Sequence, residues 1–271
     1  MNKFLLAGMA SLLLLAGCSS KIDSESQIVV GLECDYAPFN WTQIESSESA
    51  VAINGSIGYC DGYDIAMASA LAEGLGKELI VKKIAWEGLE AALSSGEIDM
   101  IVAGMTDTAE RRERVSFSDP YYASDMVLIV RNDSSFVNAT SLQDFNGAKV
   151  VAQRGTFHND LVVQIEGAVH MTPLTSFPLL ANAVISGESD AMVSERPVAI
   201  SIVNSNPQLT IVDFAEGQGF QTDVEETTVS VAIRQSDSEL RDQINAILAG
   251  ISDETRNLWM ADALSRQPEG N

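Results

Sequence analysis

The stretch Ser95-Gly96-Glu97-Ile98-Asp99-Met100-Ile101-Val102 returns in similar form as Ser186-Gly187-Glu188-Ser189-Asp190-Ala191-Met192-Val193. In each copy a helix would end at a glycine, which accepts the left-handed turn, and a short apolar strand would follow. A strand that is apolar on both faces is typical of a parallel sheet covered by helices. The repeat indicates an α/β architecture and favours two similar lobes, although any helix–glycine–strand unit could produce the likeness by chance.

The chain around this repeat alternates between strand and helix patterns. Strands are predicted at 27–32, 79–81, 99–103, 149–152, 190–193 and 227–233, and helices at 64–75, 86–95, 158–165, 176–186 and 240–251. A last short helix is expected around Trp259 and Leu264, and Ser236 with Glu239 has the spacing of a capping box. This alternation again predicts parallel strands in an α/β fold.

The N-terminus has the pattern of an export signal. Lys3 precedes an apolar run over residues 4–16, too short to span a membrane as a helix, and the run ends just before Cys18. Small residues before such a cysteine resemble the bacterial lipobox. The resemblance implies a lipoprotein signal peptide (1–17), acyl chains such as palmitate on Cys18, and a polar tether (18–27). The alternative is an ordinary signal peptide with an incidental cysteine.

Composition excludes several classes of protein. The 271 residues are 46% hydrophobic, which is globular, and 38 acidic against 16 basic residues give a net charge of −22. This acidity disfavours nucleic acid as a partner and disfavours electrostatic docking on an anionic membrane. We expect an exported protein, held at the outer face of the cell membrane or in the periplasm by lipid.

Two cysteines remain for the folded part, Cys34 and Cys60. In an exported chain an even remainder suggests one disulfide, and two buried free thiols are the alternative. His158 and His170 lack ligand spacing to either cysteine, so no metal site and no cofactor are expected. His158 is expected on the surface of a helix.

Ligands of open α/β sheets bind beyond the carboxyl ends of the strands. In this chain that rule selects the loops at 33–39, 103–106, 155–156 and 194–195. Arg111 follows near a helix start that Thr108 could cap, and a guanidinium there would bind a carboxylate. Glu195 could face it and bind an ammonium, so the pair would suit a zwitterion.

A structural interpretation of the same residues stays open at this point. Arg111 belongs to an Arg/Glu-rich segment with Arg112 and Arg114, where exposed ion pairs contribute only about 0–1 kcal/mol. Aromatic residues on α/β loops are core residues by default; here they are Tyr36, Phe39, Trp41 and Trp86.

Six ordered motifs carry a resemblance to a known family. They are Tyr36-Ala37-Pro38-Phe39, Gly62-Tyr63-Asp64-Ile65, Trp86-Glu87-Gly88-Leu89, Ile98-Asp99-Met100-Ile101-Val102-Ala103-Gly104-Met105-Thr106, Thr108-Ala109-Glu110-Arg111-Arg112 and Phe117-Ser118-Asp119-Pro120-Tyr121-Tyr122. The chain resembles the family 3 extracellular solute-binding proteins, the polar amino-acid receptors of ABC importers. The resemblance implies a two-lobed periplasmic-binding-protein-like (type II) fold with two hinge strands. Lobe 1 would comprise 28–127 with 228–271, and lobe 2 would comprise 128–227.

The resemblance also implies roles for single residues. Arg111, the Thr106 N–H and donors at Thr156 and Phe157 would hold the ligand carboxylate. The ammonium would meet the carbonyl of Gly104, which follows Ala103, together with the Thr106 hydroxyl and Glu195. The side chain would lie between Trp86 and either Tyr36 or Phe39, with Glu33 at its distal end. Two departures stand out: Glu195 where the family more often has Asp, and Phe157 where a small hydroxylated residue is usual.

The implied function is a receptor without catalysis, expected to be a monomer, that delivers a free amino acid to an ABC importer permease. Glu33 with the aromatic residues favours a cationic ligand such as arginine or lysine through charge pairing and cation–π contact. Glutamine or another neutral polar amino acid is the alternative. A dehydratase-like enzyme on the same fold and a receptor serving a sensor are further alternatives.

Overall fold

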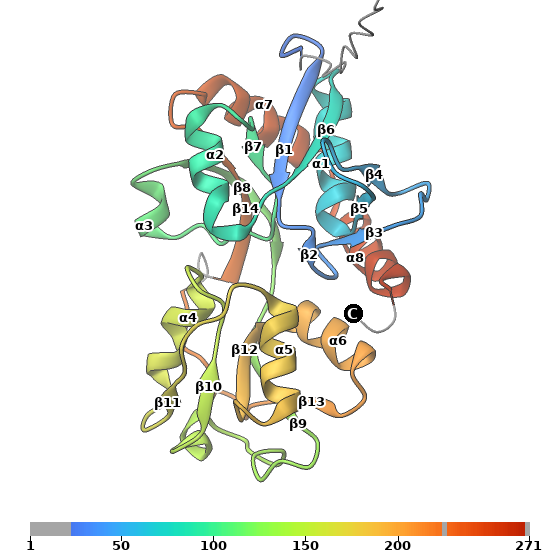
Figure 1. Ribbon diagram of the computed structural model, residues 1–271. Coiled ribbons are helices and arrows are strands. Elements are labelled where there is room, and N and C mark those ends of the chain that lie inside the picture. Colours follow the sequence, from blue (N-terminus) through green and yellow to red (C-terminus); the bar gives the residue numbers. More distant parts are fainter. Residues whose placement is uncertain (1–22, 224–226, 269–271) are drawn as a thin grey trace, which may run out of the picture.

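The computed structural model describes residues 23–223 and 227–268, which form two lobes stacked along one axis (Figure 1). We call the upper one lobe 1 and the lower one lobe 2. The predicted signal peptide and Cys18 lie outside the described residues. No helix in the described ranges is long and apolar enough to cross a membrane.

Each lobe is built on a five-stranded sheet of mixed direction. Lobe 1 has the order β6 (Glu78–Lys83), β1 (Gln27–Leu32), β7 (Met100–Ile101), β14 (Thr228–Ile233), β8 (Ser116–Ala123). Lobe 2 has the order β11 (Val169–His170), β10 (Lys149–Val151), β12 (Ala191–Glu195), β9 (Met126–Arg131), β13 (Leu209–Val212). In both, the first three strands are parallel and the fourth is antiparallel to both of its neighbours. The α/β, two-lobed prediction is confirmed.

The sequence repeat occupies the same place in both lobes. Gly96 and Gly187 end helices with φ values of +78° each, as the left-handed cap requires. The aspartates that follow act alike, since Asp99 accepts from the Val29 N–H at 2.9 Å and Asp190 from the Lys149 N–H at 2.8 Å. Each aspartate therefore ties the start of the third strand of its sheet to the second strand.

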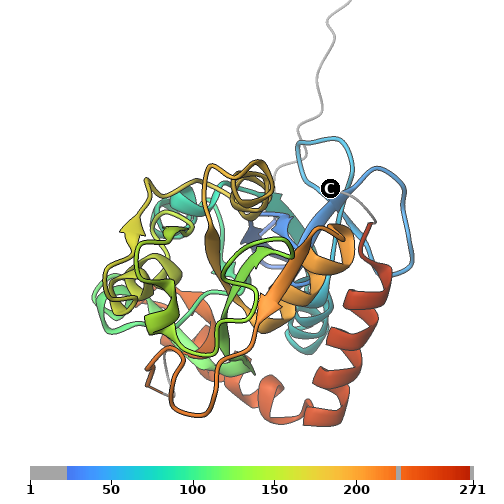
Figure 2. The same ribbon diagram turned by 90° about the horizontal axis from the view of Figure 1, so that it is seen from below.

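Helices pack around both sheets (Figure 1). Lobe 1 has α1 (Tyr63–Gly74), the 3-10 turn η1 (Trp86–Gly88), α2 (Leu89–Ser95), α3 (Ala109–Arg112), α7 (Ser238–Ala249) and α8 (Asp253–Arg266). Lobe 2 has η2 (Leu142–Phe145), α4 (Phe157–Leu161), η3 (Val162–Gln164), α5 (Phe177–Ser186) and α6 (Arg196–Ser205). Seen along the axis, α7 and α8 lie at the periphery (Figure 2).

Two predicted helix features near the C-terminus were wrong. The capping box does not form, because Asp237 is the N-cap of α7 and the Ser236 hydroxyl donates to the Asp237 carboxylate. The last helix is not short: α8 spans 14 residues, with Ser252 accepting from the Thr255 N–H. Its face is only weakly apolar, which is why periodicity did not reveal its length.

The chain passes between the lobes twice, and the two passages lie side by side. It leaves β8 at Ala123 and enters β9 at Met126, and it returns from β13 to β14 at Thr228. The Ser124 N–H donates to the Thr227 carbonyl at 2.9 Å, so the two passages are hydrogen-bonded to each other. Lobe 2 is therefore an insertion between two strands of lobe 1.

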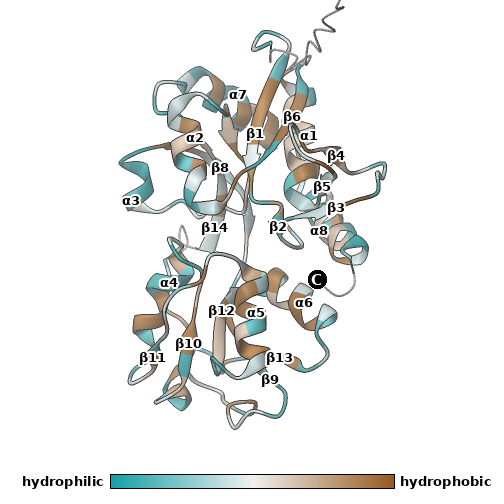
Figure 3. Cartoon of the chain, viewed as in Figure 1, coloured by the Kyte–Doolittle hydropathy of each residue, from teal (hydrophilic) through white to brown (hydrophobic). Residues whose placement is uncertain are grey.

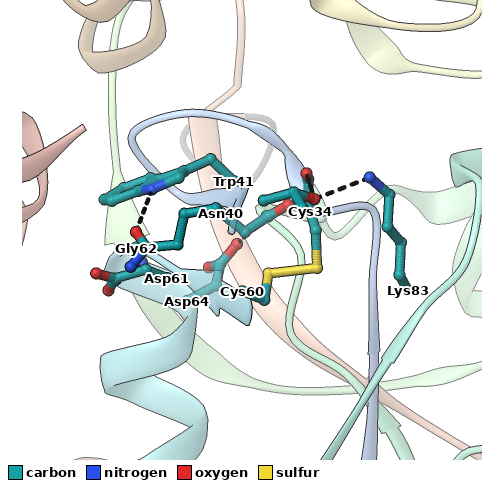
Figure 4. Close-up of a disulfide and its surroundings, with 10 residues drawn as sticks. Cys34, Asn40, Trp41, Cys60, Asp61, Gly62, Asp64 and Lys83 are labelled. Atoms are coloured by element: carbon teal, nitrogen blue, oxygen red, sulfur yellow. Dashed lines mark hydrogen bonds between the residues drawn. A yellow bond between two sulfur atoms is a disulfide. The ribbon is translucent and has the colours of Figure 1, made fainter. Parts of the chain in front are cut away.

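A small sheet beside the cleft holds the disulfide. It contains β2 (Asp35–Tyr36), β3 (Asn40–Gln43), β5 (Tyr59–Asp61) and β4 (Val51–Ala52), none of them expected from the sequence. The Cys34–Cys60 disulfide joins the end of β1 to β5, with the Cα atoms 5.8 Å apart (Figure 4). The predicted disulfide is thus present.

Apolar residues concentrate on the central strands, as β1 and β10 show in Figure 3. In lobe 1 a fully buried aromatic group comprising Phe39, Tyr63 and Tyr121 lies between α1 and β8. Phe39 stacks on Tyr36, and the Tyr36 ring also lies 4.6 Å from the tilted ring of Phe177 of lobe 2, measured between ring centroids. The core of lobe 1 therefore continues directly into the contact between the lobes.

Candidate functional site

A small cavity lies between the lobes, close to the carboxyl ends of β1, β7 and β10. Lobe 1 contributes Glu33, Tyr36, Trp86, Gly104, Thr106 and Arg111, and lobe 2 contributes Gln153, Thr156, Phe157 and His158. Eight of these ten were expected from the sequence. Phe39 and Ala103 were also expected but lie behind the wall, 0% and 2% exposed, while Glu195 contacts the cavity through Tyr36.

Arg111 is a buried cation at the junction of the lobes. Thr108 caps α3 by accepting from the Arg111 N–H, and the guanidinium donates to the Thr106 carbonyl at 2.8 Å and to the Gly155 carbonyl of lobe 2 at 3.2 Å. It lies 5.2 Å from the centroid of the Trp86 ring. Burial lowers its pKa, although a guanidinium stays charged at any physiological pH.

The neighbouring arginines behave as surface residues. Arg112 and Arg114 are half-exposed and pair with Asp107, Glu90 and Glu110. The Arg111 side chain is only 8% exposed, and its nearest carboxylate oxygen, on Glu90, is 3.8 Å away. Arg111 therefore lies in the wall of the cavity, whereas Arg112 and Arg114 form ion pairs at the surface.

Glu33 is a second buried ionisable group that lines the cavity. The Gln153 amide of lobe 2 donates to both Glu33 carboxylate oxygens at 3.2 Å, and also to the Thr175 carbonyl at 3.0 Å. Burial raises the pKa of Glu33 to about 7, against the lowering effect of the Gln153 hydrogen bond. Glu33 can therefore change its charge near neutral pH.

Glu195, at the end of β12, is the third charged group. The Tyr36 hydroxyl donates to its carboxylate at 2.5 Å, which is another hydrogen bond between lobes. Complete burial raises the pKa of Glu195 to about 7, although the Tyr36 hydrogen bond opposes the shift. The longer side chain, compared with the family's Asp, reaches the aromatic wall of lobe 1.

His158 corrects the prediction of a surface histidine. The side chain is 5% exposed, lines the cavity and places Nε2 3.7 Å from the Glu195 carboxylate. Both ring nitrogens lack hydrogen-bond partners among the described residues. Burial, together with the Arg111 charge, lowers the pKa of His158 to about 3, so the imidazole is neutral.

The loop after β7 brings backbone groups to the cavity. Gly104 adopts φ +59°, and a Cβ there would lie 2.9 Å from the Tyr36 ring, so only glycine fits. Thr106 is 4% exposed and forms a bridge with Val229 of β14. Across the cavity the Thr156 hydroxyl donates to the Gln153 carbonyl, and Phe157 begins α4.

A second hollow of about 900 Å³, open to solvent, shares Trp86, Arg111, Thr156 and Phe157 with the cavity. Its remaining wall carries four acidic residues: Glu87, Glu90, Glu110 and Asp160. Partial burial and the Glu110 carboxylate, which faces Asp160 from the other lobe, raise the pKa of Asp160. Arg111 and Arg114 also line the hollow, and Arg114 pairs with Glu90 and Glu110, so the outer approach has four acidic residues against two basic ones.

Gln153 and His158 are the two cavity residues that the sequence argument missed. Gln153 follows β10 by two residues, so the rule of strand ends could have included it. Nothing in the spacing of His158 distinguishes it from an exposed residue, because α4 is a single short helix without periodicity.

A family model for the bacterial extracellular solute-binding proteins, family 3, matches residues 28–257. This chain belongs to that family. The family consists of extracellular receptors, so the chain is an exported substrate-binding protein of ABC import. The resemblance drawn from the six motifs is thereby confirmed.

Relatives of this family 3 protein bind different amino acids. The arginine-binding extracellular protein ArtP of Bacillus subtilis is 30% identical, over 93% of this chain and 94% of its own. The glutamine-binding protein GlnH of the same organism is 26% identical, over 95% and 96%. Among solved structures, AbpA of Streptococcus pneumoniae bound to L-arginine aligns with a TM-score of 0.76 and 27% identity, over 89% and 96%.

Proposed function

We propose that this family 3 protein binds a free cationic amino acid, with arginine or lysine favoured, by closure of the two lobes, and delivers it to an ABC importer permease. The observation that carries the proposal is the charge arrangement of the cavity. One buried guanidinium, on Arg111, and one buried carboxylate, on Glu33, line a single space between the lobes, and a second buried carboxylate, on Glu195, lies behind the Tyr36 hydroxyl that lines the same space. An α-amino acid with a cationic side chain presents the complementary three charges.

Each end of the ligand has partners in this arrangement. The α-carboxylate would bind the Arg111 fork and the Thr106 N–H, with further donors at Thr156 and Phe157, because a planar guanidinium matches a carboxylate bidentately. The α-ammonium would bind Glu195, the Gly104 carbonyl and the Thr106 hydroxyl. It would take the place of the Tyr36 hydroxyl that donates to Glu195 in this structure.

The side chain of the ligand would extend between Tyr36 and Trp86 toward Glu33. There a guanidinium or ammonium would take the place of the Gln153 amide, which donates to Glu33 in this structure. ArtP and AbpA support arginine, whereas GlnH supports the alternative, glutamine, whose neutral amide resembles that of Gln153. Closure would be favoured because the ligand contacts both lobes at once.

The ligand is tested by calorimetric titration of the purified exported protein with L-arginine, L-lysine and L-glutamine. We expect arginine to bind most tightly, and Glu33→Gln to weaken arginine binding at least about tenfold while changing glutamine binding little. Glu97→Gln removes a carboxylate from the surface of lobe 1 and is the matched control. Tight glutamine binding without arginine binding would favour the alternative, and no binding of any of the three would contradict the amino-acid proposal.

The proposal includes binding without catalysis. The proximity of Glu195 and His158 is the feature that a hydrolytic or dehydratase-like alternative would need, yet among the described residues no hydrogen-bond partner orients the neutral imidazole. We expect chemically unchanged arginine to be recovered after prolonged incubation with the protein. A new product by mass spectrometry would favour the enzyme.

The attachment of the protein is proposed to be a lipid anchor on Cys18, with the folded part a monomer. Cys18→Ser should move the protein from the membrane fraction to the soluble extracellular or periplasmic fraction. Retention of the variant in the membrane fraction would contradict the anchor.

A further inference from the structure

Two of the sequence motifs, those containing Asp64 and Tyr121, contribute no side chain to the cavity. We infer that Tyr121, oriented by Asp64, is a positioning residue for the ligand loop, because its hydroxyl holds the Gly104 N–H and so fixes the direction of the Gly104 carbonyl. This inference rests on the proposed function, in which that carbonyl accepts from the ligand ammonium.

The groups form one buried chain of hydrogen bonds. The Gly104 N–H donates to the Tyr121 hydroxyl oxygen at 2.9 Å, and that hydroxyl donates its own proton to Asp64 Oδ1 at 2.7 Å. The Asn40 amide donates to the other Asp64 oxygen at 2.7 Å. All three side chains are 0% exposed, and Asn40 and Asp64 lie next to each other beside the disulfide in Figure 4.

The direction of donation follows from this order. A carboxylate can only accept, so Asp64 takes the single proton of the Tyr121 hydroxyl. The phenol oxygen is then left as an acceptor aimed at Gly104. Asp64 and Asn40 thus determine that Tyr121 accepts from the loop and does not donate to it.

The loop needs this anchor because Gly104 has no side chain, so sterics restrict its backbone dihedral angles very little. The carbonyl of Gly104 belongs to the peptide group between Gly104 and Met105. The peptide group before it is held by Tyr121, and the one after it is held by the Ser230 N–H, which donates to the Met105 carbonyl at 3.0 Å. With both neighbours held, the intervening carbonyl has a fixed direction.

A matched variant distinguishes a role of Tyr121 in positioning the ligand loop from a purely structural role in the core. The Tyr63 hydroxyl is equally buried in the same aromatic group and donates to the Tyr121 backbone carbonyl at 2.8 Å, without reaching the loop. Tyr121→Phe and Tyr63→Phe each remove one buried hydroxyl. Only the first removes the hydroxyl that accepts from the Gly104 N–H at 2.9 Å; the Asp64 carboxylate, with which the same N–H also interacts, is addressed by Asp64→Asn.

The test measures affinity for L-arginine and for L-glutamine by calorimetry, the melting temperature, and hydrogen exchange of the Gly104 amide in ¹⁵N-glycine-labelled protein. For Tyr121→Phe we expect affinity to fall about tenfold and Gly104 exchange to accelerate, since one buried hydrogen bond is lost. For Tyr63→Phe we expect a lower melting temperature with affinity within about twofold of the wild type and unchanged Gly104 exchange. Asp64→Asn, which keeps the shape, should give an intermediate loss of affinity.

The inference is overturned if Tyr121→Phe binds like the wild type, or if both tyrosine variants lose affinity equally. Should the Tyr121 variant not fold, Asp64→Asn decides, and an unchanged affinity and Gly104 exchange in that variant would overturn the inference. A wild-type protein that binds neither amino acid would contradict the proposed function instead, and Gly104 exchange would still test the anchor.

Discussion

Arg111 and Arg114 are three positions apart, yet they occupy opposite environments. Arg111 donates to backbone carbonyls of both lobes and is buried, while Arg114 pairs with Glu90 and Glu110 at the surface. A buried guanidinium that donates only to neutral carbonyls retains its positive charge for an anion. The exposed guanidinium of Arg114, in contrast, is already paired with the carboxylates of Glu90 and Glu110.

Arg111→Ala should therefore abolish measurable amino-acid binding, because the carboxylate of the ligand would lose a bidentate charged partner. Arg114→Ala should bind within about twofold of the wild type, since an exposed pair contributes about 0–1 kcal/mol. Calorimetry and thermal melting check both variants. If Arg111→Ala lowered the melting temperature of the ligand-free protein as well as abolishing binding, the loss of binding would be explained by a structural role of Arg111.

The affinity should depend on pH through the two cavity carboxylates. Burial raises the pKa of both Glu33 and Glu195 to about 7, and a cation binds only their ionised forms. Affinity for arginine should then rise with pH between about 5.5 and 7, with log affinity approaching a slope of two, because two protons must leave. Glutamine requires ionised Glu195 alone and should approach a slope of one.

Glu33→Gln is the control for this profile and should reduce the arginine slope by one. Identical slopes for arginine and glutamine in the wild type would mean that Glu33 does not pair with the ligand side chain. Calorimetry in buffers of different ionisation enthalpy counts the released protons directly.

Individual residues of the cavity region could be located from the sequence where they belong to a sequence motif or follow the end of a predicted strand. Arg111 and Gly104 belong to motifs, and Glu195 follows the strand predicted at 190–193. His158 could not be placed, because its burial results from Phe177 and Tyr36 meeting across the lobes, and no local pattern encodes such a contact.

At the scale of elements, periodicity located what is regular and apolar. The strand at Gln27–Leu32 and the helix at Phe177–Ser186 appear as predicted. The small sheet was missed because its strands have two to four residues, too few for an alternation to register. Helix α6 was missed because Glu195 leads straight into it, with Pro197 in its first turn.

The small sheet should depend on its disulfide. Replacing both Cys34 and Cys60 by Ala should lower the free energy of unfolding by about 3 kcal/mol, because the bond closes a loop with a sequence separation of 26. Denaturant unfolding measures the change, and reduction of the wild type should reproduce it. An unaltered midpoint would show that burial of the two side chains stabilises the sheet without the bond.

The whole molecule is acidic, and the excess of acidic over basic residues extends to the outer hollow. Removing residues 1–17 would take away Lys3 and no acidic residue, so the exported chain is slightly more acidic than the net charge of −22. Glu87, Glu90, Glu110 and Asp160 line the outer hollow. A cationic solute should be attracted before it makes any contact.

The association rate constant for arginine should therefore fall with salt, by about two- to fivefold between roughly 20 and 300 mM NaCl. Stopped-flow fluorescence of the tryptophans measures it. Citrulline, similar in shape but neutral in its side chain, is the control ligand and should show little dependence. If salt changed the association rate constants of arginine and citrulline equally, electrostatic attraction at the entrance would not explain the rate for arginine.

The insertion of lobe 2 between β8 and β14 has a consequence for the order of folding after export. Every strand of the lobe 2 sheet lies between residues 126 and 212, and Phe214 and Phe220 complete its core, so this lobe can form as soon as the chain up to residue 220 has crossed the membrane. The sheet of lobe 1 lacks its fourth strand, which joins β7 to β8, until residues 228–233 arrive. A newly translocated chain should thus mature from its middle outward, and the half that lies nearer the N-terminus should be the last to become resistant to proteases.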